Sequence, residues 1–131
     1  MSLLAAIRAI ADQLANTVFR RSFLEIIEEG PNRLVLESNR GTMVVDARRR
    51  VVSRNGKDLI NFERVKFVDV TREHDRGEYM EWRVDLYIGP LQNIRVGETP
   101  DDAQASIIGS RLTSLIGSKV LAWKENDHFR W

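Results

Sequence analysis

The most informative absence in this sequence of 131 residues is that of cysteine. Without a thiol, the chain can form no disulfide bridge, no thiolate nucleophile and no cysteine-ligated zinc site. Histidine is nearly absent too, since His74 and His128 are the only two. A chain without cysteine suits a reducing compartment, so we expect a cytoplasmic protein, with peripheral attachment to a membrane as the alternative.

Net charge and long apolar runs are also lacking. Twenty basic residues stand against nineteen acidic ones, so no overall field of one sign attracts nucleic acid, and we expect no nucleic-acid partner. No apolar run approaches the roughly 18 residues that a membrane span requires. Arg8 and Asp12 interrupt the first apolar stretch, which argues against a signal peptide.

The residues that are present suit a single folded domain, because 43% of them are hydrophobic and a chain of this size can bury its own core. We predict one domain over residues 1–131. It consists of an N-terminal helical extension (1–29), a core (33–117) and a C-terminal tail (118–131).

The N-terminal segment has the pattern of an amphipathic helix. Apolar residues recur at helical spacing from Leu3 to Val18, and alanine occupies five of the first fifteen positions. Residues 22–28 suit a continued helix and a short strand equally. The apolar face of the helix can pack on the domain, on a neighbouring subunit or on a membrane. The candidate interface residues are Leu3, Leu4, Ile7, Ile10 and Leu14, with Phe129 and Trp131 of the tail.

After the break at Gly30-Pro31-Asn32 the hydrophobic period changes to two, which is typical of strands. Asn55-Gly56 is the strongest hairpin signal, because both residues tolerate the positive φ of a type I′ turn. Short strands without long helical crossovers favour an antiparallel sandwich or open barrel. The seven predicted strands are 33–38, 42–47, 50–54, 57–62, 65–72, 81–88 and 92–98.

A final amphipathic helix is predicted after the strands. Thr99 suits the N-cap, Pro100 the first helical position, and Asp101 and Asp102 the positive end of the helix dipole. Gly117 suits the left-handed residue that ends a helix. The predicted apolar stripe is Ala103, Ile107, Ile108, Leu112, Leu115 and Ile116. Residues 119–123 have an extended pattern.

Several of these segments are similar to a known family. They are Met43-Val44-Val45-Asp46 with a basic corner before Val51-Val52, Ile60-Asn61-Phe62-Glu63-Arg64-Val65, the strands at 84–88 and 94–96, and Thr99-Pro100-Asp101-Asp102. Over residues 33–117 the chain resembles the bacterial pleckstrin-homology-like (PH-like) domains. The resemblance implies an α+β fold, a PH-like antiparallel seven-stranded sandwich or open barrel closed by a C-terminal amphipathic helix, here with an additional N-terminal helix.

Two features depart from that family. Eukaryotic members have a tryptophan inside the closing helix, whereas Trp123 lies beyond Gly117. Members that bind phosphoinositides have a basic first hairpin, where this chain has only Arg33 and Arg40. The fold resemblance therefore does not by itself imply lipid binding.

The densest charge lies between Arg40 and Lys57, with six basic residues and one acid, Asp46. Clustered arginines suit phosphate groups, whereas the simpler interpretation is a solvated hairpin corner whose arginines pair with acids elsewhere. The candidate patch for an anion or an anionic lipid surface is Arg48, Arg49, Arg50, Arg54 and Lys57.

Motifs for catalysis are missing. The sequence has no phosphate loop, dinucleotide fingerprint or nucleophile elbow. Glu73-His74-Asp75 is better explained as a charged turn, because adjacent residues rarely converge on one metal ion. We expect no enzyme activity, no cofactor and no metal. The sequence favours a binding or assembly module that associates with itself or with another protein, and peripheral binding to an anionic membrane is the alternative.

Overall fold

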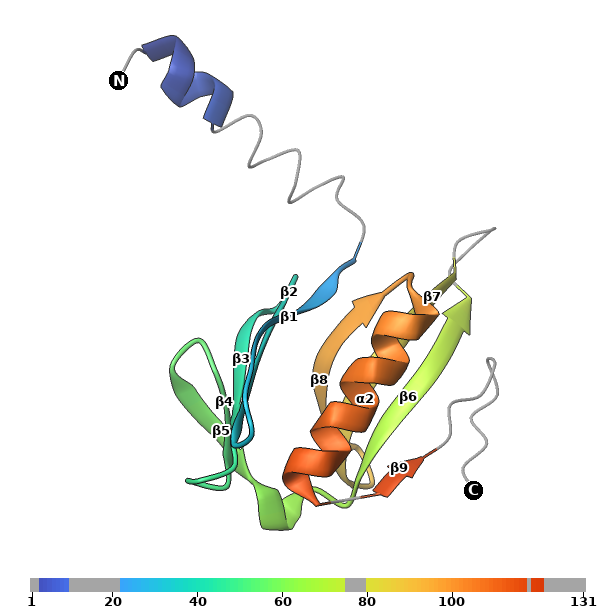
Figure 1. Ribbon diagram of the computed structural model, residues 1–131. Helices are drawn as coiled ribbons and strands as arrows, with labels where there is room; N and C mark the ends of the chain where they lie inside the picture. The colour runs from blue at the N-terminus through green and yellow to red at the C-terminus, as the bar shows by residue number, and fades with distance from the viewer. Residues whose placement is uncertain (1–2, 10–21, 75–79, 118, 122–131) are drawn as a thin grey trace.

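The computed structural model describes residues 3–9, 22–74, 80–117 and 119–121 (Figure 1). Residues 3–9 form a helix, and two sheets with the helix α2 (Asp102–Ile116) form the body of the molecule. An α+β fold with a C-terminal helix is therefore confirmed. The described strands form two open sheets in a sandwich-like arrangement and do not close into a barrel.

The first sheet is an antiparallel meander of five strands in chain order. Its first strand decides between the two alternatives for residues 22–28, because residues 24–29 pair with the second strand and are not helical. The register of the first pair shifts between Ile26 and Glu28, which makes a β-bulge at Ile27. The strands are β1 (Leu24–Glu29), β2 (Arg33–Ser38), β3 (Gly41–Asp46), β4 (Val51–Arg54) and β5 (Lys57–Asn61).

Turn chemistry sets the register of this sheet. Asn55 and Gly56 have φ values of 51° and 81°, as the predicted hairpin requires. The Asn55 side chain also accepts a hydrogen bond from the backbone N–H of Thr42 at 2.9 Å. Gly41 faces that side chain, and a Cβ at Gly41 would lie 2.5 Å from its oxygen. The two turns at this end of the sheet are thus packed on each other.

The second sheet follows a short 3-10 helix, η1 (Phe62–Arg64). Three of its strands are antiparallel, β6 (Phe67–His74), β7 (Met80–Gly89) and β8 (Gln92–Thr99). A fourth, β9 (Lys119–Leu121), pairs with β6 in the parallel direction. The extended segment predicted after α2 is therefore confirmed over residues 119–121, and its remainder lies outside the described residues.

Helix α2 begins two residues later than the caps suggested. Asp101 is the N-cap, because its side chain accepts hydrogen bonds from the backbone N–H groups of Ala103 and Gln104. The hydroxyl of Thr99 instead accepts from the N–H of Asp101 at 3.2 Å, and Pro100 precedes the helix. Gly117 ends it with a φ of 82°, as predicted.

The buried face of α2 differs in part from the predicted stripe. Ala103 and Ile107 are exposed, whereas Ala105 and Gly109 are buried. Gly109 allows a close approach to β6, because a Cβ there would lie 2.7 Å from the Val70 side chain. The other buried members are Ile108, Leu112 and Ile116.

One core lies between the inner faces of both sheets and α2. Figure 1 shows α2 covering one face of the second sheet, with the first sheet beside it. The period-two residues of each sheet point into this core, as the alternation predicts. The first sheet contributes Leu24, Leu34, Leu36, Met43, Val45, Val52 and Ile60, and the second contributes Val68, Val70, Trp82, Val84, Leu86 and Val96.

Candidate interaction surfaces

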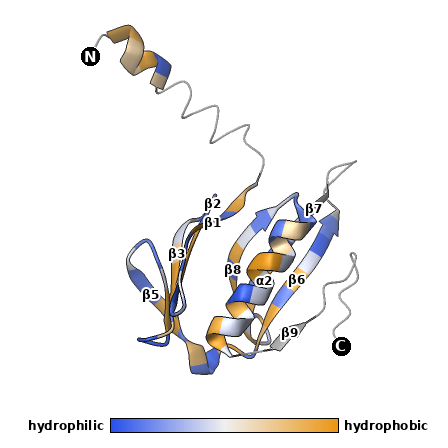
Figure 2. Ribbon diagram, in the orientation of Figure 1, coloured by the Kyte–Doolittle hydropathy of each residue, from blue (hydrophilic) through white to orange (hydrophobic). Residues whose placement is uncertain are grey.

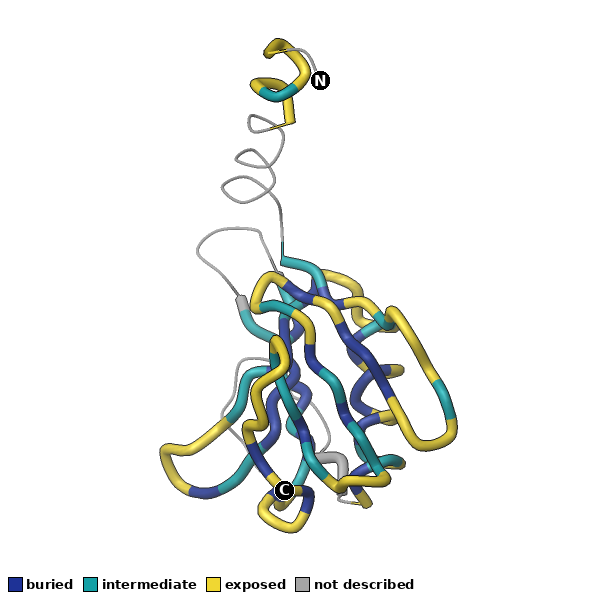
Figure 3. Tube along the Cα trace, turned by 90° about the vertical axis from the view of Figure 1, so that its left-hand side faces the viewer, coloured by how far each residue is buried: buried dark blue, intermediate teal, exposed yellow. Residues whose placement is uncertain are grey.

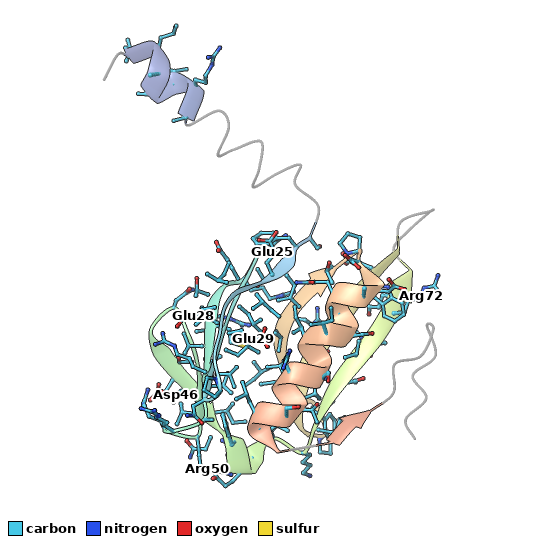
Figure 4. All side chains as sticks on the ribbon, viewed as in Figure 1. Glu25, Glu28, Glu29, Asp46, Arg50 and Arg72 are labelled. Carbon is cyan, nitrogen blue, oxygen red and sulfur yellow. The ribbon has the colours of Figure 1, made fainter. Side chains whose placement is uncertain are left out.

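The basic corner between β3 and β4 is largely paired with acids. The Asp46 carboxylate accepts hydrogen bonds from the backbone N–H groups of Arg48 and Arg49, at 3.0 and 3.2 Å, and so holds the turn. Arg49 forms an ion pair with Asp58 at 2.8 Å, and Arg50 forms one with Glu63 at 2.6 Å. The hydrogen bond from Arg50 lowers the pKa of Glu63. Figure 4 shows Arg50 and Asp46 on the outer side of the first sheet.

The five residues of the predicted patch have different surroundings. Arg54 is half-buried and donates to the carbonyl oxygen of Arg95 on β8. Burial, together with the charge of Arg40, lowers the pKa of Arg54. Arg48 and Lys57 are exposed, and their side chains have no partner among the described residues. Of the five predicted residues, only Arg48 and Lys57 are therefore exposed cations without a partner among the described residues.

A charged network that the sequence did not reveal covers the outer face of the second sheet. At its centre is Asp85, whose exposed fraction is 3%. The Asp85 carboxylate lies 2.5 Å from Arg95 Nε and 3.6 Å from Arg83 Nε. Burial raises the pKa of Asp85 more than these two arginines lower it. Asp69, directly opposite on β6, adds like charge and also raises the pKa of Asp85.

The network extends to the first sheet through Glu98. The Glu98 carboxylate lies 3.1 Å from Arg95 and 2.8 Å from Arg40, which belongs to the β2–β3 turn. Burial opposes ionisation of Glu98, but the hydrogen bond from Arg40 and the charge of Arg95 outweigh it and lower the pKa of Glu98. The network therefore links the two sheets.

Within the described residues, no group of three or more histidine, cysteine, aspartate or glutamate side chains could hold a metal ion.

The alternation of β7 could have indicated part of this network, because it places Glu81, Arg83 and Asp85 on the face opposite the core residues. Its partners could not be inferred, since Arg40 and Glu98 are 58 positions apart in the sequence. Glu73 of the predicted Glu73-His74-Asp75 turn is an ion-pair partner of Arg83. His74 ends β6, and its side chain and Asp75 lie outside the described residues.

The N-terminal helix exposes its apolar face. The exposed fractions of Leu3, Leu4 and Ile7 are 78%, 78% and 55%. Figure 2 shows this helix as mainly hydrophobic, and Figures 1 and 3 show it apart from both sheets. Three of the predicted interface residues are thus placed together, and no other described part of the chain covers them. The other four, Ile10, Leu14, Phe129 and Trp131, lie outside the described residues.

A hollow of about 370 Å³ lies between the start of β1 and the start of α2, and it is lined by Phe23, Leu24, Glu25, Pro100, Asp101 and Gln104, among others. The exposed fractions of Ile27 and Ile107 are 53% and 48%. Two carboxylates, Glu25 and Asp101, border the hollow.

Comparison with protein-family models, curated proteins and solved structures finds no match for this chain. Within the described part of the chain, none of the helices has the length and apolar character needed to span a bilayer. The exposed surfaces of the protein are therefore the basis for proposing its function.

Proposed function

We propose that this protein is a non-enzymatic assembly module on a PH-like scaffold, which associates with itself or with another protein through its N-terminal helix. The order of the strands and the C-terminal helix support the scaffold. The observation that carries the function is the exposure of Leu3, Leu4 and Ile7 on a helix that stands apart from the body. Exposed apolar clusters of this kind are typical of interaction sites.

The oligomeric state in solution tests this proposal. Light scattering and sedimentation equilibrium over a range of concentrations would compare the full chain with a variant that lacks residues 1–20. We expect the full chain to form a dimer or larger assembly and the shortened chain to be a monomer. A full chain that stays monomeric and captures no protein partner would contradict the proposal.

A matched pair of variants separates the apolar face from a general effect of charge. On a helix, Leu4 and Ile7 share one face, whereas Ala5 and Ala9 lie on the opposite face. L4E/I7E and A5E/A9E add the same charge to the same helix. We expect L4E/I7E to abolish assembly and A5E/A9E to leave it intact. Equal effects of the two variants would exclude the apolar face as the interface.

The alternative, peripheral binding to an anionic membrane through the basic corner, has weaker support, because Arg49 and Arg50 already pair with acids and Arg54 turns toward β8. Only the exposed side chains of Arg48 and Lys57 favour it. Co-sedimentation with anionic vesicles tests it. Binding that falls with salt and is lost in R48Q/K57Q would support the alternative, and equal behaviour with neutral vesicles would remove it.

A further inference from the structure

We propose that the outer face of the first sheet, the face turned away from α2, packs on the same face of a second copy. This contact is separate from the N-terminal helix and goes beyond the function proposed above. Its central residues are Arg33, Val35 and Glu37 of β2. They alternate with Leu34 and Leu36, which belong to the core, and therefore point outward. Figure 1 places the first sheet on one side of the molecule, and Figure 3 views the molecule from that side.

An apolar row crosses the middle of this face. Val35 pairs with Val44 of β3, which pairs with Ser53 of β4, so alternation places the three side chains on the same face. Bulges at the two edges of the sheet bring Ile27 of β1 and Leu59 of β5 beside this row. Val35 is buried without belonging to the core, whereas the exposed fractions of Ile27 and Leu59 are 53% and 39%. A sheet face with apolar side chains in solvent along its middle suits contact with another sheet.

One end of the face is acidic. Glu37 pairs with Glu25 of β1, and alternation places both exposed carboxylates on the outer side. Like charges directly opposite each other on a sheet are destabilising, and neither carboxylate has an ion pair or a side-chain hydrogen bond with another described residue. Figure 4 shows Glu25 and Asp46 toward opposite ends of the first sheet. A cation from outside the chain would relieve the repulsion at the acidic end.

The other end of the face is basic. Arg33 begins β2 and Arg48 lies in the β3–β4 turn, and both side chains are exposed without an ion pair to another described residue. Asp46 pairs with Arg33 in the register, but its carboxylate accepts hydrogen bonds from the backbone N–H groups of Arg48 and Arg49. Arg33 is therefore an exposed cation without an ion pair, about 13 Å along β2 from Glu37.

The order of these groups on β2 identifies the occupant as a second copy. Arg33, Val35 and Glu37 are evenly spaced, so the strand is its own complement when it is turned end to end. A twofold axis at Val35, between the copies and perpendicular to the strands, places Arg33 of each copy opposite Glu37 of the other. Sheets packed face to face lie about 10 Å apart, and an arginine and a glutamate side chain together can bridge that gap.

Other occupants match only part of this face. The described N-terminal helix has one charged side chain, Arg8, so it could neutralise the acidic end and would leave Arg33 unpaired. A partner with charge of one sign has the same shortcoming. A second copy of the face complements both ends and covers the apolar row in a single contact, and such complementarity also fixes the orientation of the two sheets.

The size of the face predicts a weak contact. Five strands of four to six residues form a surface of about 20 Å by 20 Å, or about 400 Å² from each copy. Interfaces of this size lie at the low end of those that proteins use. We therefore expect the contact to form at protein concentrations of about 0.1–1 mM, above those at which the helix contact is tested.

Charge reversal on β2 tests the contact. All variants are made in the full-length L4E/I7E chain, which removes the contribution of the N-terminal helix, and sedimentation equilibrium follows them up to about 1 mM. We expect L4E/I7E to dimerise weakly, and R33E or E37R each to raise the dissociation constant about tenfold, because each places like charges across both pairs. The matched control R64E reverses an exposed charge on η1, outside this face, and should change the constant less than about twofold.

Mixing the two variants gives the decisive result. The R33E chain has acidic groups at both ends of the strand and the E37R chain has basic groups at both, so each complements the other and neither complements itself. An equimolar mixture should dimerise at least as tightly as L4E/I7E, and R33E/E37R in one chain should return to the L4E/I7E value. A mixture no tighter than either variant alone, or an L4E/I7E chain that stays monomeric at about 1 mM, would overturn the contact.

The remaining outcomes separate this contact from the proposed role of the helix. An effect of R64E equal to that of R33E would reduce the result to overall charge and would overturn the sheet contact. Assembly of the original chain that L4E/I7E leaves intact and R33E abolishes would support the sheet contact and contradict the helix as the interface.

Discussion

The two helices at opposite ends of the described chain have similar patterns and very different surroundings. Helix α2 buries Ile108, Leu112 and Ile116 against both sheets. The N-terminal helix leaves Leu3, Leu4 and Ile7 largely in solvent. An amphipathic pattern therefore indicates that a helix needs an apolar partner, and it does not say whether that partner belongs to the same chain. In α2 the partner is internal, and in our proposal the partner of the first helix is another copy or another protein.

The largest effect on stability is expected from truncating a buried side chain of α2. I108A or L112A would leave a cavity beneath α2, because both side chains are fully buried. We expect each to lower the free energy of unfolding by about 2–5 kcal/mol, measured by urea denaturation at a protein concentration where the chain is monomeric. A loss below about 0.5 kcal/mol would contradict the placement of α2 in the core.

The next largest loss of stability is expected where α2 packs closely on β6. G109A would place a Cβ 2.7 Å from the Val70 side chain, so α2 or β6 must shift. We expect a loss of about 1–3 kcal/mol in the free energy of unfolding. This substitution adds an atom and leaves no cavity. The matched control is A9G in the first helix, which should leave the stability of the body unchanged. A neutral or stabilising G109A would mean that α2 lies further from β6.

A smaller effect is expected from pH. Burial raises the pKa of Asp85 above its ordinary value of 3.8, so the folded state holds this proton more tightly than the unfolded state. The stability that this group contributes is present at low pH and is lost as pH rises from about 4 through the raised pKa. The free energy of unfolding of the original chain, minus that of D85N, should therefore fall over this window.

The pH dependence of the stability difference between the original chain and D85N also tests whether the first helix contacts the body. The chain without residues 1–20 should have the same pH dependence, because Asp85 contacts Arg83 and Arg95 within the body. A difference between original chain and D85N that rises with pH would show that the arginines outweigh burial. A pH dependence that disappears with residues 1–20 would show that the first helix covers the network.

The smallest effect is expected where the apolar side chains are exposed. L4A and I7A should change the free energy of unfolding of the monomeric body by less than about 0.5 kcal/mol, although both should weaken assembly. Urea denaturation at low concentration would measure the first effect and sedimentation equilibrium the second. A loss comparable to that of I108A would mean that the first helix packs on its own body, and the contrast between the two helices would be wrong.

Much of the fold followed from local pattern. The strand bounds at 33–38 and 57–62 agree with β2 and β5 within one residue, because alternation and the Asn55-Gly56 turn act over short distances. The end of α2 at Gly117 was also predicted. Its start was not, since Thr99 and Asp101 are both good caps and only the path of β8 into the helix selects Asp101.

The surfaces were harder to predict. Arg48, Arg49, Arg50, Arg54 and Lys57 are close in sequence, yet their partners Asp58, Glu63 and the β8 backbone are set by how the sheets meet. The network around Asp85 depends on the same packing. The assignment of residues 24–29 was open because isoleucine suits helix and strand alike, and pairing with β2 decided it.

The sequence alone determined which segments alternate, where the chain turns and which helices have an apolar face, because these properties depend on neighbouring residues. The tertiary structure decided which apolar faces are covered. Packing of α2 on β6 and β7 buries Ile108 and leaves Ile107 exposed, and Ile27 is exposed at the bulge in β1. Contacts between distant segments therefore decide which apolar side chains remain in solvent.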